Sequence, residues 1–490
     1  MDRYILSFDQ STSTTKALLF DQYGHLVARS DCAHRQIVDD RGWVEHDGEQ
    51  IIANLYAAAE TLLKQHAVDR SLITAVALSN QRETTIAWDR STGRSLANAI
   101  VWQCGRAQQI CEELDTSKAL IHERTGLHLS PYFSAAKMAW LLRMVPAVQE
   151  HVERGTLVLS TMDSFLLYHL SEEKVVKTEP SNASRTQLLN IHNGCWDEQV
   201  VRLFGIPLSS LPEICDSNSL FGHTTVGGLL DRPVPIHGIL GDSQGALYAQ
   251  GCLEPGSIKA TYGTGSSIMM NIGTKPVLSD DLVTSIAWSL GGERTYVLEG
   301  NVNYSGATIS YLVDDLELFH SVKEVARLAM DAKDIEGLYL VPAFSGLGAP
   351  YWNSHARGLI TGLDRRCTKA EIARAAEQAI AYQIADIVFL MDEQSGHRVK
   401  TIRVDGGATN DVYLMQFQAD ILQSAVNVSS IEELSGLGPA LLCAQKCGLL
   451  EGDDHRTRAV KATYQSRMPA QERDERYHGW KQAVRRTLVD

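Results

Sequence analysis

The fold is decided by a segment near the start of the chain, residues 4–20, which reads YILSFDQSTSTTKALLF. Its apolar runs at residues 4–8 and 17–20 predict two β-strands, and a short turn leads to a third predicted strand at residues 26–28. The first two strands enclose an entirely polar stretch, residues 9–16, with five consecutive hydroxyl side chains and a final lysine. We interpret this stretch either as an ordinary hairpin turn or as a loop that offers hydroxyls, backbone N–H groups and a cation to a phosphate.

The same pattern of strand, small hydroxyl-rich turn and strand returns past the midpoint, where residues 258–270 read IKATYGTGSSIMM. A third turn, residues 404–408 (VDGGA), connects an apolar strand to a predicted helix with an apolar face at Leu414, Phe417 and Ile421. Glycines in these turns let the backbone approach a bound anion or nucleoside closely. Each turn alone is also consistent with a plain connection. Three of them together favour a nucleotide-binding α/β protein with two related halves.

The chain is long enough for two domains. Its 490 residues exceed the roughly 250–300 that one hydrophobic core organises. We place the boundary where the apolar pattern breaks, giving an N-terminal domain at residues 1–250 and a C-terminal domain at residues 251–490. In the second domain, Thr368 followed by Glu371 predicts a capping box. It opens an amphipathic helix whose apolar positions run through residues 372–388.

Composition and missing motifs exclude several classes of function. The formal net charge is −14, which argues against nucleic acid or an anionic membrane as the main partner. No apolar run reaches the ~18 residues of a membrane span. The nine cysteines are scattered without a CxxC pair, so we expect reduced thiols and a cytoplasmic protein. The chain has no GxxxxGK[ST] loop, no complete dinucleotide fingerprint, and neither an HExxH nor a GxSxG motif.

A second set of residues suggests a site for an acceptor that carries hydroxyl groups. Asp242 follows an apolar predicted strand, where a carboxylate can take a proton from a hydroxyl nucleophile; the alternative is a cap on the next helix. Arg82 and Glu83 can bind neighbouring hydroxyls of a polyol, or they form a surface ion pair. Trp102 and Tyr132 pack either on the carbon skeleton of such a ligand or in the core.

These residues lie in stretches that resemble the FGGY carbohydrate kinases, in particular the branch of that family that phosphorylates glycerol. The resemblance covers nearly the whole chain and is carried by residues 42–47 (GWVEHD), 80–85 (NQRETT), 99–104 (AIVWQC), 133–140 (FSAAKMAW), 182–186 (NASRT), 346–352 (GLGAPYW), 403–408 (RVDGGA) and 414–418 (LMQFQ). It implies an α/β fold of two actin-like ATPase (ribonuclease H-like) domains, with ATP and the acceptor bound in the cleft between them.

The resemblance also implies a role for each candidate residue. Asp242 matches the catalytic base, and Mg²⁺ is associated with Asp9 and Asp242. The positions that match acceptor-binding residues are Arg82, Glu83, Trp102, Tyr132, Asp242 and Ser243. The positions that match nucleotide-binding residues are Thr12, Ser13, Thr14, Lys16, Thr264, Gly306, Gly407 and Ala408. By the same analogy we expect a small-molecule polyol or sugar as the partner, and a homodimer or homotetramer.

The acceptor side departs from the family pattern at two positions. Ser243 stands where glutamine is usual after the catalytic aspartate, and Ser267 stands where phenylalanine is usual in the second turn. Both changes make the pocket larger and more polar. Two acceptors therefore stay open: glycerol, giving glycerol 3-phosphate, or a polyol or ketose of four or five carbons whose extra hydroxyl the serines bind. A non-kinase actin-like ATPase is a third possibility, against which Arg82, Glu83 and Asp242 speak.

Overall fold

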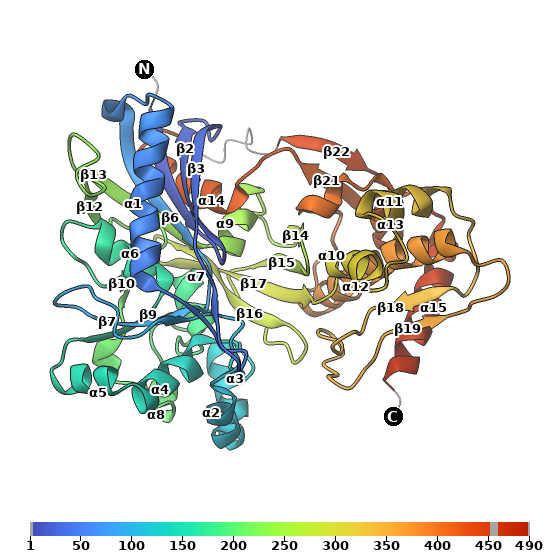
Figure 1. Ribbon diagram of the computed structural model, residues 1–490, viewed down its shortest axis with the longest axis horizontal. Coiled ribbons are helices and arrows are strands. Elements are labelled where there is room, and N and C mark those ends of the chain that lie inside the picture. Colours follow the sequence, from blue (N-terminus) through green and yellow to red (C-terminus); the bar gives the residue numbers. More distant parts are fainter. Residues whose placement is uncertain (1–2, 451–458, 489–490) are drawn as a thin grey trace.

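The computed structural model describes residues 3–450 and 459–488, which form two lobes side by side (Figure 1). The first lobe contains a six-stranded sheet in the order β12-β13-β6-β1-β2-β3. Its strands are β1 (Tyr4–Gln10), β2 (Thr14–Asp21), β3 (Leu26–Ala33), β6 (Ile73–Asn80), β12 (Gly222–Thr224) and β13 (Val234–Gly241). Strands β1, β2 and β3 are antiparallel, whereas β1, β6 and β13 are parallel.

The second lobe repeats this design in a seven-stranded sheet of order β16-β17-β15-β14-β20-β21-β22. The strands are β14 (Ile258–Tyr262), β15 (Ser266–Gly273), β16 (Val283–Leu290), β17 (Glu293–Val302), β20 (Thr401–Asp405), β21 (Ala425–Ser429) and β22 (Val460–Tyr464). Strands β17-β15-β14-β20-β21 match β3-β2-β1-β6-β13 in order and direction. The predicted fold of two related α/β domains is confirmed.

A smaller sheet of order β4-β5-β8-β7-β9 is inserted in the first lobe. It comprises β4 (Ile37–Val38), β5 (Val44–His46), β7 (Thr85–Asp89), β8 (Ala99–Ile100) and β9 (Leu157–Thr161). The first lobe also contains the helices α2 (Gln108–Glu113), α3 (Lys118–Thr125), α4 (Ser134–Met144), α5 (Pro146–Glu153), α6 (Met162–Leu170), α7 (Pro180–Ala183) and α8 (Glu198–Leu203), of which α4, α5 and α6 pack on β7 or β9 of the small sheet. Two-stranded pairs are β10 (Lys177–Thr178) with β11 (Glu213–Ile214), and β18 (Tyr339–Val341) with β19 (Leu359–Thr361).

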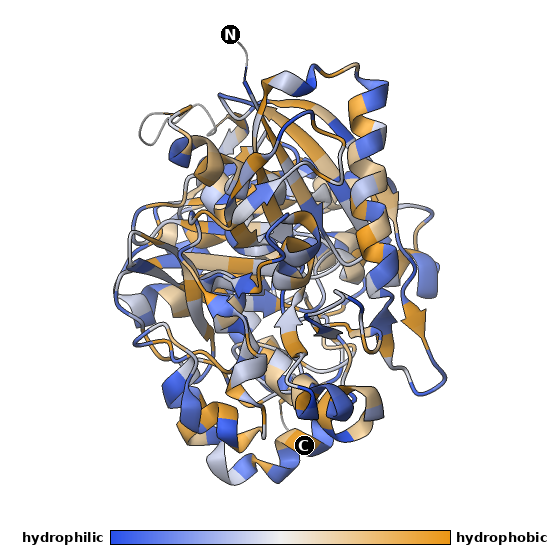
Figure 2. Ribbon diagram, turned by 90° about the vertical axis from the view of Figure 1, so that its left-hand side faces the viewer, coloured by the Kyte–Doolittle hydropathy of each residue, from blue (hydrophilic) through white to orange (hydrophobic). Residues whose placement is uncertain are grey.

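Helices cover both large sheets. Helix α1 (Gly48–Gln65) packs on β2 and β3 through an apolar stripe. The second lobe carries α10 (Gly306–Ser310), α11 (Val322–Asp331), α12 (Lys369–Ser395), α13 (Val412–Leu422) and α15 (Ala470–Thr487). In Figure 2 the strands inside the molecule are mainly hydrophobic, whereas the outer helices alternate hydrophobic and hydrophilic turns. None of the described helices combines the length and apolar composition that a membrane span needs.

Helix α14 (Leu434–Lys446) crosses from the second half of the chain to the first sheet. It packs on β1, β6 and β13 and against α9 (Asp242–Ala249), as Figure 1 shows. The two helices touch closely, because a Cβ added at Gly438 would lie 2.2 Å from the carbonyl oxygen of Gly245. Both helices begin at the junction between the lobes, so this contact fixes the position of Asp242, the first residue of α9.

Helix α12 begins with the predicted capping box. The side chain of Thr368 accepts a hydrogen bond from the N–H of Ala370 at 3.2 Å, and the N–H of Thr368 donates to Glu371 at 2.8 Å. The hydrogen bonds of Glu371, the one from the Thr368 hydroxyl foremost, lower the pKa of that carboxyl to about 2. The box satisfies N–H groups that the first helical turn would otherwise leave unpaired.

We therefore expect Thr368→Ala to lower the free energy of unfolding by about 1 kcal/mol, the usual cost of losing such a cap. The measurement is the urea midpoint of the transition that includes the second lobe. Glu393→Ala is the control, because Glu393 is an exposed residue of the same helix and such changes stay within about 0.5 kcal/mol. Equal losses in both variants would show that the cap does not stabilise the helix.

Candidate active site

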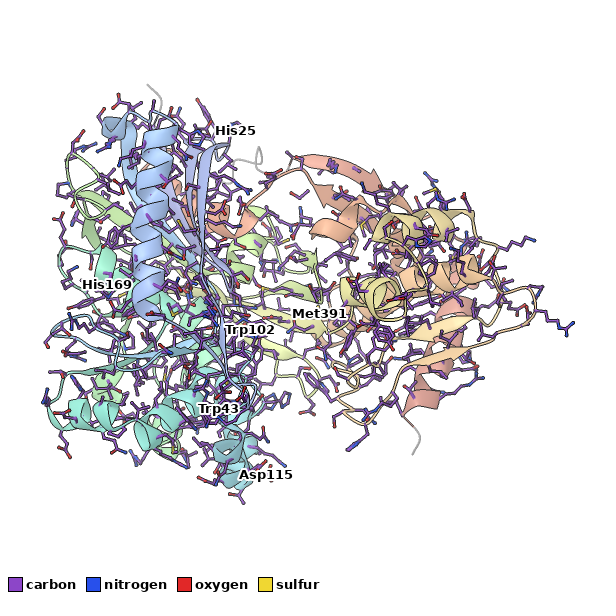
Figure 3. The ribbon with its side chains drawn as sticks, in the orientation of Figure 1. His25, Trp43, Trp102, Asp115, His169 and Met391 are labelled. Atoms are coloured by element: carbon purple, nitrogen blue, oxygen red, sulfur yellow. The ribbon has the colours of Figure 1, made fainter. Side chains whose placement is uncertain are left out.

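A cavity of about 860 Å³ lies between the two lobes and is lined by residues of both. The turn between β1 and β2, the turn between β14 and β15, and the end of β20 all reach it, so the three turns singled out in the sequence meet at one place. Predicted site residues that line it are Asp9, Thr12, Lys16, Arg82, Glu83, Trp102, Tyr132, Asp242, Ser243 and Thr264. Figure 3 shows Trp102 where the two lobes meet.

The first turn presents Thr12 and Lys16 to the cavity, whereas other hydroxyls hold the turn itself. Thr14 does not line the cavity; its Oγ1 lies 3.0 Å from the Oγ of Ser11. Ser13 is exposed at the tip of the turn and also lies outside the lining. The Nζ of Lys16 lies 2.5 Å from Oε2 of Glu433, the residue just before α14. Lys16 is thereby oriented by the helix that crosses between the lobes.

Asp9 lies at the base of this turn and is almost completely buried. Burial raises the pKa of Asp9 to about 6; Lys16, 3.9 Å away, opposes the rise, and the nearby carboxylates of Asp242 and Glu433 add to it. Within residues 3–450 and 459–488, its Oδ1 has no hydrogen-bond partner. A buried carboxylate with an unbonded oxygen is suited to bind a cation, because burying a charge without a partner is costly.

The donor set fits Mg²⁺, which usually takes one or two carboxylates together with phosphate oxygens and water. Asp9 and Asp242 face the same cavity and supply two carboxylates. In the described part of the chain no group of three or more His, Cys, Asp or Glu side chains is placed to hold a metal by itself. The residues therefore suit an ion that arrives with a phosphate ligand rather than one caged by the protein.

The second and third turns approach the cavity through backbone. Gly263, Thr264 and Gly265 line it directly, and the N–H of Gly306 donates to the carbonyl of Gly263 at 3.0 Å. Gly306 therefore braces the turn from behind, outside the cavity lining. At Gly406, φ is +100° and an added Cβ would lie 2.2 Å from the carbonyl oxygen of Tyr262. A side chain is excluded there on both grounds.

The helix predicted directly after the third turn begins later than expected. Gly407 and Ala408 lie in a 3₁₀ turn, residues 407–410, and outside the cavity lining. Helix α13 starts at Val412, because the side chain of Asp411 accepts from the N–H of Leu414 at 2.9 Å and caps it there. An aspartate at this place is a strong helix-start signal that the sequence prediction did not use.

A buried ion network connects the predicted acceptor residues. The Nε of Arg82 lies 3.1 Å from Oδ1 of Asp242, and its two terminal nitrogens bond to Glu299 at 2.9 and 3.0 Å. Arg185 bonds to Glu83 at 2.5 Å and to Glu299 at 3.0 Å. Arg82 and Glu83 are buried, so the alternative prediction that they form a surface ion pair is wrong. They are joined through Arg185 and Glu299 rather than to each other.

Glu299 is the centre of this network, and it belongs to β17 of the second sheet. Burial alone would raise the pKa of Glu299, but Arg185 and Arg82 outweigh burial and lower it to about 2. Neither Glu299 nor Arg185 is among the predicted site residues, although Arg185 lies in residues 182–186, which carry the family resemblance. The apolar run at residues 296–298, directly before Glu299, is the local signal that this part of the strand is buried.

Lys259 is a further buried ionisable residue on the same sheet face as Glu299, and it is not among the predicted site residues. Its Nζ donates to the hydroxyl of Thr261 at 3.1 Å, and that hydroxyl donates to Asp405 at 3.2 Å. Burial lowers the pKa of Lys259, and Asp405 opposes this effect. Lys259 and Asp405 both line the cavity, so the floor near the second turn contains an amino group beside a carboxyl group.

An aromatic wall closes the other side. The ring centroids of Trp102 and Tyr132 are 5.6 Å apart in an edge-to-face arrangement. The indole N–H of Trp102 donates to Oγ1 of Thr12 at 3.0 Å, which connects this wall to the first turn. Buried Lys137 donates to the backbone carbonyls of Tyr132 and Phe133. The aromatic pair is therefore held from behind and presents ring faces and edges to the cavity.

Asp242 lies at the end of β13 as the first residue of α9. Gly241 occupies the cap position and its N–H donates to the hydroxyl of Ser181 at 2.9 Å, so the helix-cap alternative for Asp242 is wrong. Oδ1 of Asp242 accepts from the N–H of Ser243 at 2.7 Å. A carboxylate fixed in this way, beside an arginine and open to a cavity, is suited to accept a proton from a bound hydroxyl.

Comparisons with known proteins identify the family. The N-terminal domain of the FGGY family of carbohydrate kinases matches residues 4–249, and the C-terminal domain of that family matches residues 258–447. Glycerol kinase 1 of Thermotoga maritima is 43% identical over 99% of this chain and 100% of its own length. A glycerol kinase of Stenotrophomonas maltophilia is 41% identical, with 99% of each chain covered.

Solved structures give the same picture. Plasmodium falciparum glycerol kinase with ADP superimposes with a TM-score of 0.94 at 33% identity, covering 100% of this chain and 99% of that one. A ligand-bound xylulose kinase of Lactobacillus acidophilus has a TM-score of 0.87 at 20% identity over 99% and 97% of the two chains. The second likeness concerns the fold alone.

Proposed function

The chain belongs to the FGGY family of carbohydrate kinases, and from that premise we propose that it phosphorylates glycerol at a terminal hydroxyl to give glycerol 3-phosphate. It is an ATP-dependent phosphotransferase with an alcohol as acceptor. The glycerol kinase relatives support glycerol as the acceptor, and the structural observation that best supports phosphoryl transfer to a hydroxyl is the contact between Arg82 and Asp242 at 3.1 Å. This contact lies in the cavity that is also lined by residues of the β1–β2 turn, the β14–β15 turn and the turn after β20.

The reaction needs one proton acceptor and a positioned pair of reactants. The terminal hydroxyl oxygen attacks the γ-phosphorus, the bond to the β,γ-bridging oxygen breaks, ADP leaves, and the hydroxyl proton passes to the carboxylate of Asp242. Arg82 orients that carboxylate. We expect Arg82 and Glu83 to bind the remaining hydroxyls, and Trp102 with Tyr132 to pack on the carbon skeleton. Fixing both reactants in this way supplies much of the catalysis in phosphoryl transfer.

The nucleotide is expected to lie along the three turns. Thr12, Lys16 and Thr264 face the cavity and would contact phosphate oxygens. We propose Ser13, Thr14, Gly306, Gly407 and Ala408 as residues that shape these turns or contact the nucleotide through backbone. Mg²⁺ would be held by Asp9 and Asp242 and would neutralise charge on the β- and γ-phosphates. The domain limits 1–250 and 251–490, a cytoplasmic location and a homodimer or homotetramer stay predictions.

A coupled ADP-release assay tests this function. We expect saturable ADP release that depends on glycerol, disappears when EDTA removes Mg²⁺, and returns when Mg²⁺ is added in excess. The control is ATP turnover without any acceptor, which should be much slower because water is a poor substitute for a positioned hydroxyl. ATP binding with a flat response to glycerol and to every other polyol or sugar would contradict the kinase function.

A further inference from the structure

A polar pair lies on the strand wall of the cavity. Ser267 of β15 and Asn301 of β17 are directly opposite each other in the antiparallel ladder, so their side chains are on the same face of the sheet. Both residues line the cavity. The next pair on this face contains Glu299, whose Cα partner is Met269. The polar pair therefore lies one strand repeat, about 7 Å, beyond the carboxylate that holds Arg82.

The side-chain polar atoms of this pair have no hydrogen-bond partners in the described part of the chain. Oγ of Ser267 is buried and makes no hydrogen bond, whereas the adjacent Ser266, on the opposite face, contacts the hydroxyl of Ser305 at 2.8 Å. The side chain of Asn301 is exposed to the cavity. A buried hydroxyl without a partner costs about 1–3 kcal/mol, so an unpaired one in a cavity wall points to a ligand group.

Ser243 adds a third neutral polar group to the same cavity. Its backbone N–H donates to Asp242, which places its side chain next to the proposed base. Serine hydroxyls and an asparagine amide can each donate and accept. They match a ligand hydroxyl or carbonyl. A carboxylate or phosphate would instead be bound by a cationic side chain, and neither member of the pair provides one.

This inference rests on the proposed function, because it concerns the acceptor of the same reaction. Glycerol has two hydroxyls besides the reacting one, and the proposed contacts with Arg82 and Glu83 engage them. No hydroxyl of glycerol is then left for the polar pair. We propose that Ser267 and Asn301 form a subsite for an additional hydroxyl of a linear, uncharged polyol or ketose of four or five carbons. Its terminal hydroxyl is phosphorylated by the same transfer from ATP, with the proton passing to Asp242.

The test compares kcat/KM for glycerol with kcat/KM for erythritol, threitol, ribitol, xylitol, xylulose and ribulose in the ADP-release assay. We expect at least one longer acceptor to have a kcat/KM no lower than that of glycerol. Ser267→Ala and Asn301→Ala should each lower the ratio of longer acceptor to glycerol by about tenfold, the value of one hydrogen bond near 1.4 kcal/mol.

Ser285→Ala is the matched control. Ser285 on β16 also has a buried hydroxyl without a partner among the described residues, but it lies outside the cavity lining. Its removal should leave the ratio unchanged. Melting temperature and ADP affinity are recorded for every variant. Asn301 is exposed, so Asn301→Ala provides the test even where a change at Ser267 disturbs folding.

Two outcomes overturn the inference while the proposed function stands. In the first, glycerol is phosphorylated but none of the four- and five-carbon acceptors is. In the second, Asn301→Ala changes the ratio of kcat/KM for the longer acceptor to kcat/KM for glycerol no more than Ser285→Ala does. ADP release that no acceptor stimulates, glycerol included, overturns the proposed function and the subsite together. Preferential phosphorylation of a sugar acid such as gluconate would also contradict the inference, because neither Ser267 nor Asn301 carries a positive charge that would bind the carboxylate.

Discussion

Asp242→Asn is expected to lower kcat by about 10²- to 10⁴-fold, the usual contribution of a positioned general base, while ADP still binds. Asparagine has nearly the same shape, so the loss reflects the missing proton acceptor. Arg82 keeps its two hydrogen bonds to Glu299, which should hold the rest of the acceptor site in place. The measurement is single-turnover ADP formation at saturating glycerol, together with an ADP titration.

Two controls separate the base from other roles of Asp242. Asp331→Asn changes an exposed aspartate of α11 and should leave kcat unaltered. A titration with Mg²⁺ distinguishes proton transfer from metal binding, because a defect in metal binding alone is restored by a high Mg²⁺ concentration. A variant with near-normal kcat, or one rescued fully by Mg²⁺, would remove Asp242 from the role of base.

The second large effect is expected at Glu299, where Glu299→Gln should lower the free energy of unfolding by about 3–5 kcal/mol, the cost of removing one partner from a buried ion pair. The variant leaves Arg82 and Arg185 buried with less negative charge nearby. Urea unfolding measures the change. Glu293→Gln is the matched control, because Glu293 is an exposed glutamate of the same strand and should change stability by no more than about 0.5 kcal/mol.

Acid denaturation gives an independent measurement of the same network. In the folded protein the pKa of Glu299 is about 2, against an ordinary value of 4.5. The unfolded chain therefore binds more protons as the pH falls, and the contribution of Glu299, complete above pH 4.5, is lost between about pH 4.5 and 2. Glu299→Gln should flatten the fall in stability in this window. An unchanged slope would show that folding does not lower the pKa of Glu299.

The sequence predicted the parts of the site that depend on local chemistry. The strand–turn–strand units around residues 9–16 and 263–265, and Asp242 at a strand end, are readable because apolar runs and small polar turns lie next to each other in the chain. Family resemblance assigned them roles. The same reasoning misplaced the start of α13 because the capping aspartate, Asp411, was passed over in favour of the glycines.

The ion network could not be predicted from the sequence, because its members come together only in the folded chain. Glu299 is 217 residues from Arg82 and 114 from Arg185, and no local pattern links a glutamate in a strand to arginines in another domain. Ser13 and Thr14 are a different case, because their roles in nucleotide binding stay predictions. The run of hydroxyls does not show which members face the cavity: Ser13 is exposed at the tip of the turn, and Thr14 contacts Ser11 within it.

The crossing of helix α14 has a consequence for how the protein is made. The inner face of the first sheet, with Leu18 and Phe20, is covered by Leu437 and Leu441, which are synthesised long after it. While the ribosome translates the residues between, the emerging first lobe lacks this cover, and unprotected apolar surface of this kind promotes aggregation and chaperone binding. The nascent chain therefore completes its first lobe only when its second is nearly finished.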